Sequence, residues 1–186
     1  MGIIHADPVP QFADNPWLRS PGQYASDHVG VSCQQIAEVI LDIDSADITF
    51  ANIPGTYRDL LVLANLRNDH AGTGADLAYM QFNADAGANY RSSSSATTTG
   101  IFIGNNPNAG TPANEVGTFW LWIFDYSRTA WKKTAQGQNT VNQPVGFLVT
   151  NNAGFWAVTD AISEIRIYPA SGNFVAGSRA TLWGFV

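Results

Sequence analysis

The chain has 186 residues, of which 45% are hydrophobic, 12% aromatic and only 13% charged, and its formal net charge is −6. This length suits one domain with a sizeable core. Its single cysteine, Cys33, excludes an intramolecular disulfide and a cysteine-based zinc site. The acidic balance disfavours nucleic acid and anionic membranes as partners. Because charged residues usually make up about 25% of a chain, we expect a surface rich in uncharged polar groups or covered by other subunits.

The sequence also carries no recognisable export or membrane signal. It begins Met1-Gly-Ile-Ile-His-Ala-Asp-Pro8, without a basic start or a long apolar stretch. The longest apolar run, Phe119-Trp-Leu-Trp-Ile-Phe124, is far shorter than the ~20 residues that cross a bilayer. We therefore expect a protein that is made inside a cell without export.

Residues 1–34 differ in composition from the rest of the chain. Prolines at four positions favour an extended backbone over regular structure: Pro8, Pro10, Pro16 and Pro21. At ~3.3 Å per residue, an extended segment of this length spans on the order of 100 Å. Large side chains between the prolines predict an arm that docks, with these anchors: Phe12, Trp17, Leu18 and Tyr24. The arm could pack on its own domain or on a neighbouring subunit.

Residues 35–186 show the pattern of short β-strands separated by turns. Alternating or continuous apolar residues predict strands over 36–43, 48–50, 59–67, 77–82, 117–126, 130–136, 145–150, 161–168 and 179–186. Serine, asparagine, glycine and proline dominate two long loops, 90–100 and 105–114. No stripe of helical period appears. The prediction is one all-β domain, an antiparallel β-sandwich or jelly roll, that follows the extended arm.

Two of these strands are apolar on both faces. Residues 59–67 form a nearly continuous apolar run, and residues 117–126 place large apolar side chains at successive positions. Such strands are typical of the middle of a sheet that is covered on both sides. We expect both strands to be buried twice. The basic pair Lys132-Lys133 is expected on a solvated strand face.

No residue pattern predicts catalysis, a metal or a cofactor. The histidines are His5, His28 and His70, and no nucleophile motif or metal-ligand spacing accompanies them. The spacing of the carboxylates does not select a catalytic pair. The segment from Asn83 to Asn89 alternates oxygen-bearing side chains but lacks the terminal glutamate of a calcium loop. We interpret it as an Asx-rich turn with Gly87 at positive φ.

Three motifs, in order, resemble a β-sandwich domain found in virion proteins of tailed bacteriophages. They are Ile48-Thr-Phe-Ala-Asn-Ile-Pro-Gly-Thr-Tyr-Arg-Asp-Leu60, Gln81-Phe-Asn-Ala-Asp-Ala-Gly-Ala-Asn-Tyr90 and Gly177-Ser-Arg-Ala-Thr-Leu-Trp-Gly-Phe185. The chain departs from the family pattern at Trp183, where tyrosine is commoner, and at Ala84, where glycine is common. The resemblance covers roughly residues 36–186.

This resemblance implies a non-enzymatic structural protein of a virion, assembled in the host cytoplasm. The short chain and the aromatic arm favour a capsid decoration, or cement, protein. Such a protein binds the major capsid protein across capsomer junctions, as a homo-oligomer and on symmetry grounds as a trimer. The alternative is a tail-fibre or tail-tip domain that binds a host receptor or glycan. For that role the aromatic residues expected to be exposed are Tyr90, Trp131 and Trp156.

Overall fold

The computed structural model describes residues 33–72, 74–93, 98–143 and 146–186. One compact unit comprises Cys33–Val186. Its first strand begins at Cys33, so Cys33 and Gln34, which were expected in the arm, belong to the sheet. The expected anchors of the arm lie outside the described residues: Phe12, Trp17, Leu18 and Tyr24.

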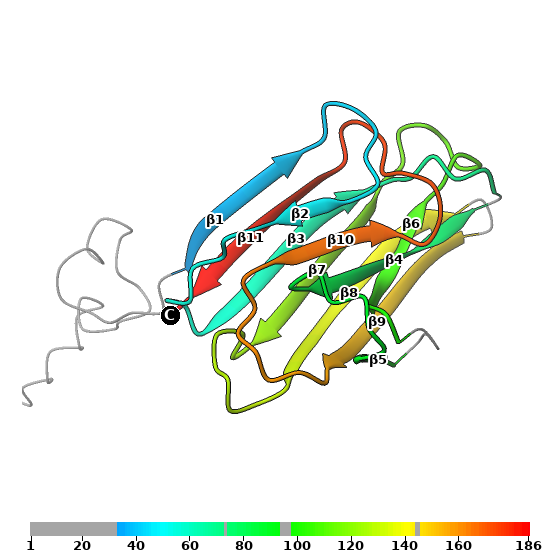
Figure 1. Cartoon of the computed structure of the whole chain (residues 1–186). Helices are drawn as coiled ribbons and strands as arrows, with labels where there is room; N and C mark the ends of the chain where they lie inside the picture. Colours follow the sequence, from blue (N-terminus) through cyan, green and yellow to red (C-terminus); the bar gives the residue numbers. More distant parts are fainter. Residues whose placement is uncertain (1–32, 73, 94–97, 144–145) are drawn as a thin grey trace, which may run out of the picture. The chain divides into compact units, whose positions relative to one another are not determined.

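Two antiparallel sheets pack together (Figure 1). The strands are β1 (Cys33–Ile40), β2 (Ile48–Phe50), β3 (Asp59–Leu66), β4 (Ala75–Phe82), β5 (Tyr90–Ser92), β6 (Ile101–Pro107), β7 (Gly117–Phe124), β8 (Lys133–Gln143), β9 (Gly146–Trp156), β10 (Ile165–Pro169) and β11 (Arg179–Phe185). The larger sheet has the order β1-β11-β3-β7-β8-β9-β5, and the smaller one β2-β10-β4-β6. The prediction of an all-β antiparallel sandwich is confirmed, while a jelly-roll topology stays a prediction.

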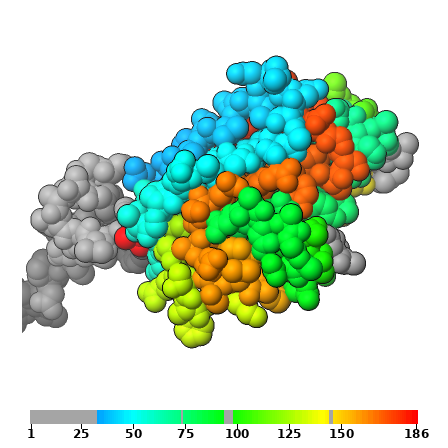
Figure 2. Space-filling model, viewed as in Figure 1, coloured from blue at the N-terminus to red at the C-terminus, as the bar shows by residue number. Residues whose placement is uncertain are grey.

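Segments from distant parts of the chain lie side by side in this fold. In the larger sheet, β11 pairs with both β1 and β3, so the end of the chain is inserted between two early strands. In the smaller sheet, β10 pairs with β2 and β4. The surface in Figure 2 accordingly shows early segments (cyan) beside late ones (orange). Because these pairs are non-local, the order of the strands within each sheet does not follow their order along the chain.

The core lies between the inner faces of the two sheets. Along β7, Phe119, Leu121 and Ile123 alternate with outward residues and are at most 1% exposed. Residues of the smaller sheet, including Met80 and Ile167, meet them in one continuous apolar cluster. The period-2 alternation of a strand thus places one apolar row of each sheet in the core.

Asparagine side chains join the two sheets where β6 is irregular. The register between β4 and β6 shifts, which leaves Ile103 opposite no partner. The Asn152 side-chain amide of β9 donates to the Ile103 carbonyl oxygen over 2.9 Å. Asn139 of β8 both donates to the Asn105 carbonyl and accepts from its N–H, over 2.9 and 2.8 Å. These bonds satisfy backbone groups that the bulge would otherwise bury without partners.

The expectation that β3 and β7 are buried on both faces was wrong. On their outer face, Leu63 is 40% exposed, Trp120 39% and Phe124 40%. In the described residues, the layer that packs against the larger sheet is the smaller sheet, and it covers the inner face of the larger sheet. The outer face of the larger sheet therefore carries apolar side chains in contact with solvent.

Candidate functional site

The outer face of the larger sheet presents a cluster of large apolar side chains, which we call the aromatic strip. It belongs to the neighbouring strands β11, β3 and β7, where Trp183 pairs with Leu61 and Leu61 with Trp122. The ring centroids of Trp122 and Phe185 are 4.5 Å apart. The strip consists of Leu61, Leu63, Trp120, Trp122, Phe124, Trp183 and Phe185. Contiguous exposed apolar surface of this kind marks interaction sites in other proteins.

The surface around the strip is uncharged. Every outward side chain of β7, β8 and β9 in the described residues is aromatic, aliphatic, hydroxyl or amide. Charged groups stand at the margins: Glu38 on β1, Arg179 on β11 and Arg91 on β5. A hollow of about 320 Å³ lies between Glu38, Arg179 and Trp120. Depletion of charge at the centre, with aromatic residues enriched, is the composition found at the core of protein interfaces.

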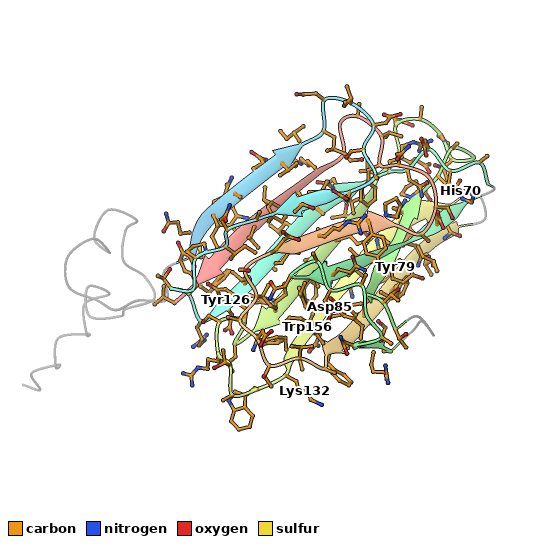
Figure 3. The ribbon with its side chains drawn as sticks, viewed as in Figure 1. His70, Tyr79, Asp85, Tyr126, Lys132 and Trp156 are labelled. Atoms are coloured by element: carbon orange, nitrogen blue, oxygen red, sulfur yellow. The ribbon has the colours of Figure 1, made fainter. Side chains whose placement is uncertain are left out.

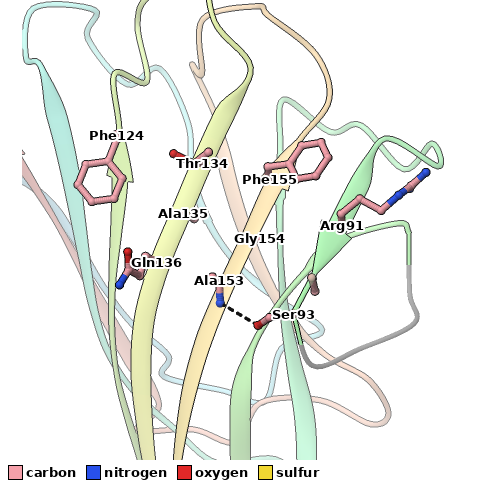
Figure 4. A pocket seen from close by; sticks show the side chains of 10 residues that line it. Arg91, Ser93, Phe124, Thr134, Ala135, Gln136, Ala153, Gly154 and Phe155 are labelled. Atoms are coloured by element: carbon pink, nitrogen blue, oxygen red, sulfur yellow. Dashed lines mark hydrogen bonds between the residues drawn. The ribbon is translucent and has the colours of Figure 1, made fainter.

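A second hollow, of about 410 Å³, lies on the same face over β8, β9 and β5, and we call it the β8–β9 hollow (Figure 4). It is lined by Arg91, Ser92, Ser93, Phe124, Thr134, Ala135, Gln136, Ala153, Gly154 and Phe155. Strand register explains the arrangement. Phe124 pairs with Thr134 and Thr134 with Phe155, so two aromatic side chains stand on either side of a small one.

Two of the three aromatic residues expected to be exposed are in the core. Tyr90 is 0% and Trp156 2% exposed, and their rings stack with centroids 6.3 Å apart. The Tyr90 hydroxyl accepts from the Phe82 N–H and donates to the Phe82 carbonyl, over 2.9 and 3.3 Å. Burial raises the pKa of Tyr90 to about 12. The expectation that Tyr90 and Trp156 are exposed for contact with a glycan is therefore wrong, whereas Trp131 is 64% exposed, as expected.

The structure of the loop between β4 and β5 gives a physical reason for one of the three motifs that resemble the phage domain. The Trp156 indole N–H donates to Asp85 Oδ2 over 2.6 Å, and Asn89 Nδ2 donates to the same oxygen over 2.9 Å (Figure 3). The Gly87 N–H donates to Asp85 Oδ1 over 2.8 Å, which confirms the Asx turn. The hydrogen bond from Trp156, followed by those from Asn89 and Gly87, holds the pKa of Asp85 below its usual value, against the effect of burial.

The prediction of positive φ at Gly87 was wrong. Positive φ occurs instead at Asn83, 52°, and at Ala84, 53°. Asparagine tolerates this region because its short polar side chain bonds locally. Here Asn83 Oδ1 accepts from the Ser163 N–H over 2.8 Å. Alanine has no such compensation, which gives a physical reason for the glycine that the resembling family carries at the position of Ala84.

Lys133 is buried and does not lie on a solvated face, which corrects the expectation for the Lys132-Lys133 pair. It is 1% exposed, at the first position of β8 on the inner side of the sheet. Its ammonium group donates to the carbonyl oxygens of Trp131 and Thr159 over 2.9 and 3.0 Å, and to that of Arg128. Burial lowers the pKa of Lys133. Lys132, the next residue back, is exposed as expected (Figure 3).

Acidic residues that could have served in catalysis take part in local structure. Asp59 Oδ1 accepts from the Asp125 N–H over 2.9 Å. Asp76 Oδ2 accepts from Asn68 Nδ2 over 2.9 Å, and His70 Nδ1 lies 3.5 Å from the same oxygen. In the part of the chain that the structure describes, no group of three or more His, Cys, Asp or Glu side chains is arranged to hold a metal ion.

The sequence matches no protein-family profile, and no curated protein aligns with it significantly. Among the described residues there is also no helix of the length and apolarity that membrane crossing requires. The fold defines an all-β sandwich, and its most distinctive surface is the outer face of the larger sheet. Sequence reasoning missed that surface, although its signal was the apolar run from Phe119 to Phe124, which we assigned to burial within the domain.

Proposed function

We propose that this protein is a non-enzymatic structural component of a tailed-phage virion, in which the aromatic strip is buried against another virion subunit. The observation that carries the proposal is the uncharged, aromatic outer face of the larger sheet. Exposed tryptophan and phenylalanine side chains on a rigid sheet are typical anchors of protein interfaces. The virion assignment is supported by the three motifs that resemble phage β-sandwich domains.

Within the virion, we propose a capsid decoration protein that binds the major capsid protein across capsomer junctions. Burial of the strip would stabilise the shell, because a ligand that binds only the assembled state shifts the equilibrium toward it. The expected anchors in residues 1–32 would add contacts to a neighbouring subunit. A trimer suits a junction with threefold symmetry.

Immunogold electron microscopy of intact particles tests the location, with an antibody raised against the sandwich domain. Label distributed over the head supports decoration. Label confined to the tail supports the second candidate function below, and particles without label contradict the virion assignment.

Binding to shells that lack the protein tests the role of the strip. We expect Trp120→Ala and Trp122→Ala to weaken binding at least tenfold, because central aromatic anchors contribute most of an interface's affinity. Trp131→Ala is the matched control, since Trp131 is an exposed tryptophan outside the strip. Unchanged binding of both strip variants would contradict the proposed interface.

The second candidate function is a tail-fibre or tail-tip domain that binds a host glycan. The β8–β9 hollow favours it, because aromatic walls and hydroxyl and amide groups line a space of ligand size. This candidate keeps the glycan-binding expectation but moves it away from Tyr90 and Trp156.

A further inference from the structure

We propose that the aromatic strip of one copy of this chain binds the proline-rich N-terminal segment of a neighbouring copy, with Trp17 and Leu18 as the anchors. The N-terminal segment is residues 1–32, which lie outside the described residues. This inference rests on the proposed function, in which the strip is buried against another virion subunit, and it names that subunit as a second copy. Such a head-to-tail contact can close into a ring, including a trimer.

The point where the described domain begins places the N-terminal segment next to a strip residue. The segment is followed directly by Cys33, which pairs with Phe185 across β1 and β11. Prolines 16 and 21 favour an extended backbone, and at ~3.3 Å per residue the chain from Trp17 to Cys33 then spans about 50 Å. The strip is only about 10 Å wide, because it occupies three strands about 4.8 Å apart. An extended segment therefore carries Trp17 well past that distance, and the strip of a neighbouring copy is within its reach.

The strip has the chemistry of a surface that binds proline-rich segments. Such segments dock on aromatic side chains and lose little conformational entropy, because proline already restricts the backbone. The indole N–H of Trp183 donates to Thr181 Oγ1 over 3.2 Å, whereas those of Trp120 and Trp122 donate to no described residue. A proline-rich backbone offers carbonyl acceptors but few N–H donors. The two indole groups are therefore donors that suit such a segment.

The charges of the two surfaces are also compatible. From Asn15 to Ser26 the segment carries one charged residue, Arg19. The side chains of the strip are uncharged, so the anchors can be buried on it without desolvating a charge. At the margin, Glu38 is exposed and forms no ion pair with another described residue. The one arginine of the segment can remain at this margin.

Sedimentation velocity on the full chain tests the inference by complementation between two variants. Trp17→Ala/Leu18→Ala removes the anchors and keeps the strip, while Trp120→Glu disrupts the strip and keeps the anchors. We expect the wild type to self-associate, and each variant alone to do so at least tenfold more weakly. An equimolar mixture of the two variants should form a heterodimer, because the intact segment of one variant can bind the intact strip of the other.

Trp131→Ala is the matched control, because Trp131 is an exposed tryptophan outside the strip. It should self-associate like the wild type. Trp120 is 39% exposed, and Trp120→Ala offers a milder change if Trp120→Glu impairs folding.

Three results would overturn the inference. A wild type that stays monomeric at its highest soluble concentration would show that the strip does not bind a second copy. Undiminished self-association of Trp17→Ala/Leu18→Ala would show that the strip binds a part of the second copy other than these anchors. A mixture of the two variants that stays monomeric would show that the contact is not made between an N-terminal segment and a neighbouring strip.

Failure of this inference is distinguishable from failure of the proposed function. Strip variants that lose shell binding, together with a monomeric wild type, would leave the strip as an interface with the major capsid protein. Only the second copy would then be excluded as its partner. Conversely, particles without immunogold label would contradict the virion assignment but not the self-association.

Discussion

The two faces of β7 carry nearly the same amount of apolar side chain but have opposite surroundings. Phe119, Leu121 and Ile123 face the smaller sheet and are at most 1% exposed. Trp120 and Phe124, on the other face, are 39% and 40% exposed. The inner row is held by the fold itself. The outer row has no counterpart in the described chain, so its apolar character is better explained by what the protein binds than by how it folds.

The comparison shows what an apolar strand can and cannot reveal. Every second side chain of a strand is buried only where a second layer covers that face of the sheet. Here the second layer consists of β2, β10, β4 and β6. An uninterrupted apolar run is equally compatible with a third layer in the same domain and with a partner molecule. Energetic tests separate the two, because only the inner row contributes strongly to the stability of the isolated protein.

The largest expected difference is between adjacent residues of β7. Phe119→Ala should lower the free energy of unfolding by about 3–5 kcal/mol, because it leaves a cavity in the core. Trp120→Ala should lower it by less than about 1 kcal/mol, the value of a cross-strand contact on an exposed face. Urea denaturation, with midpoint and slope fitted separately, measures both. Equal losses for the two variants would mean that the outer face is part of the protein's own core.

The next largest effect concerns two adjacent lysines. Lys133→Ala should cost about 2–4 kcal/mol, because it removes a buried side chain whose ammonium group is the donor to three part-buried carbonyl oxygens. Lys132→Ala should change stability by no more than about 0.5 kcal/mol, as exposed substitutions do. The same denaturation assay compares them. A small loss for Lys133→Ala would show that water replaces the ammonium group and that the site is not dry.

The sandwich was predictable because most strands carry a clear apolar alternation, but some boundaries were not. The strand expected at 130–136 is β8, which runs from Lys133 to Gln143. The second half of β8 places Gln138 and Thr140 outward and pairs with β9. This half is therefore a strand because of its partner strand, and not because its residues alternate between apolar and polar. β1 likewise begins with polar residues, Cys33 to Gln35, at an edge where apolar side chains are not required.

The candidate site was less predictable than the fold. Whether an aromatic residue is buried depends on strands far away in the sequence: Tyr90 and Trp156 pair across β5 and β9 and are covered by Phe82. The β8–β9 hollow requires Phe124, Thr134 and Phe155 to align on three strands. That alignment is a matter of register between consecutive strands, and a slip of one residue would turn these side chains to the other face of the sheet.

An acid titration tests the hydrogen bond that Trp156, a residue of the inner face, donates to the Asp85 carboxylate. The folded state lowers the pKa of Asp85 below 3.8, its value in an unfolded chain. Its contribution is therefore present above about pH 4 and is lost as the pH falls through the lower, folded-state pKa. Asp85→Asn should cost about 1 kcal/mol at pH 7, and this gap should close toward pH 2. A gap that is independent of pH would show that the charge on Asp85 contributes nothing.

The smallest effect, and the one with the opposite sign, is expected at Ala84. An alanine at φ 53° is strained, since the Cβ atom approaches the backbone in the left-handed region. Ala84→Gly should relieve that strain, and although glycine makes the unfolded chain more flexible, we expect a net gain of about 0.5–1 kcal/mol. Ala86→Gly, in the same loop but without positive φ, should instead destabilise by about 0.4–1 kcal/mol. The melting temperatures of the two variants show whether the backbone is strained at Ala84.

If both variants lose stability, the loop is not strained at Ala84, and the glycine of the resembling family has another cause. If only Ala84→Gly gains, the stability of the β4–β5 loop depends on backbone conformation as well as on the hydrogen bonds around Asp85, and the resemblance in this motif acquires a physical basis.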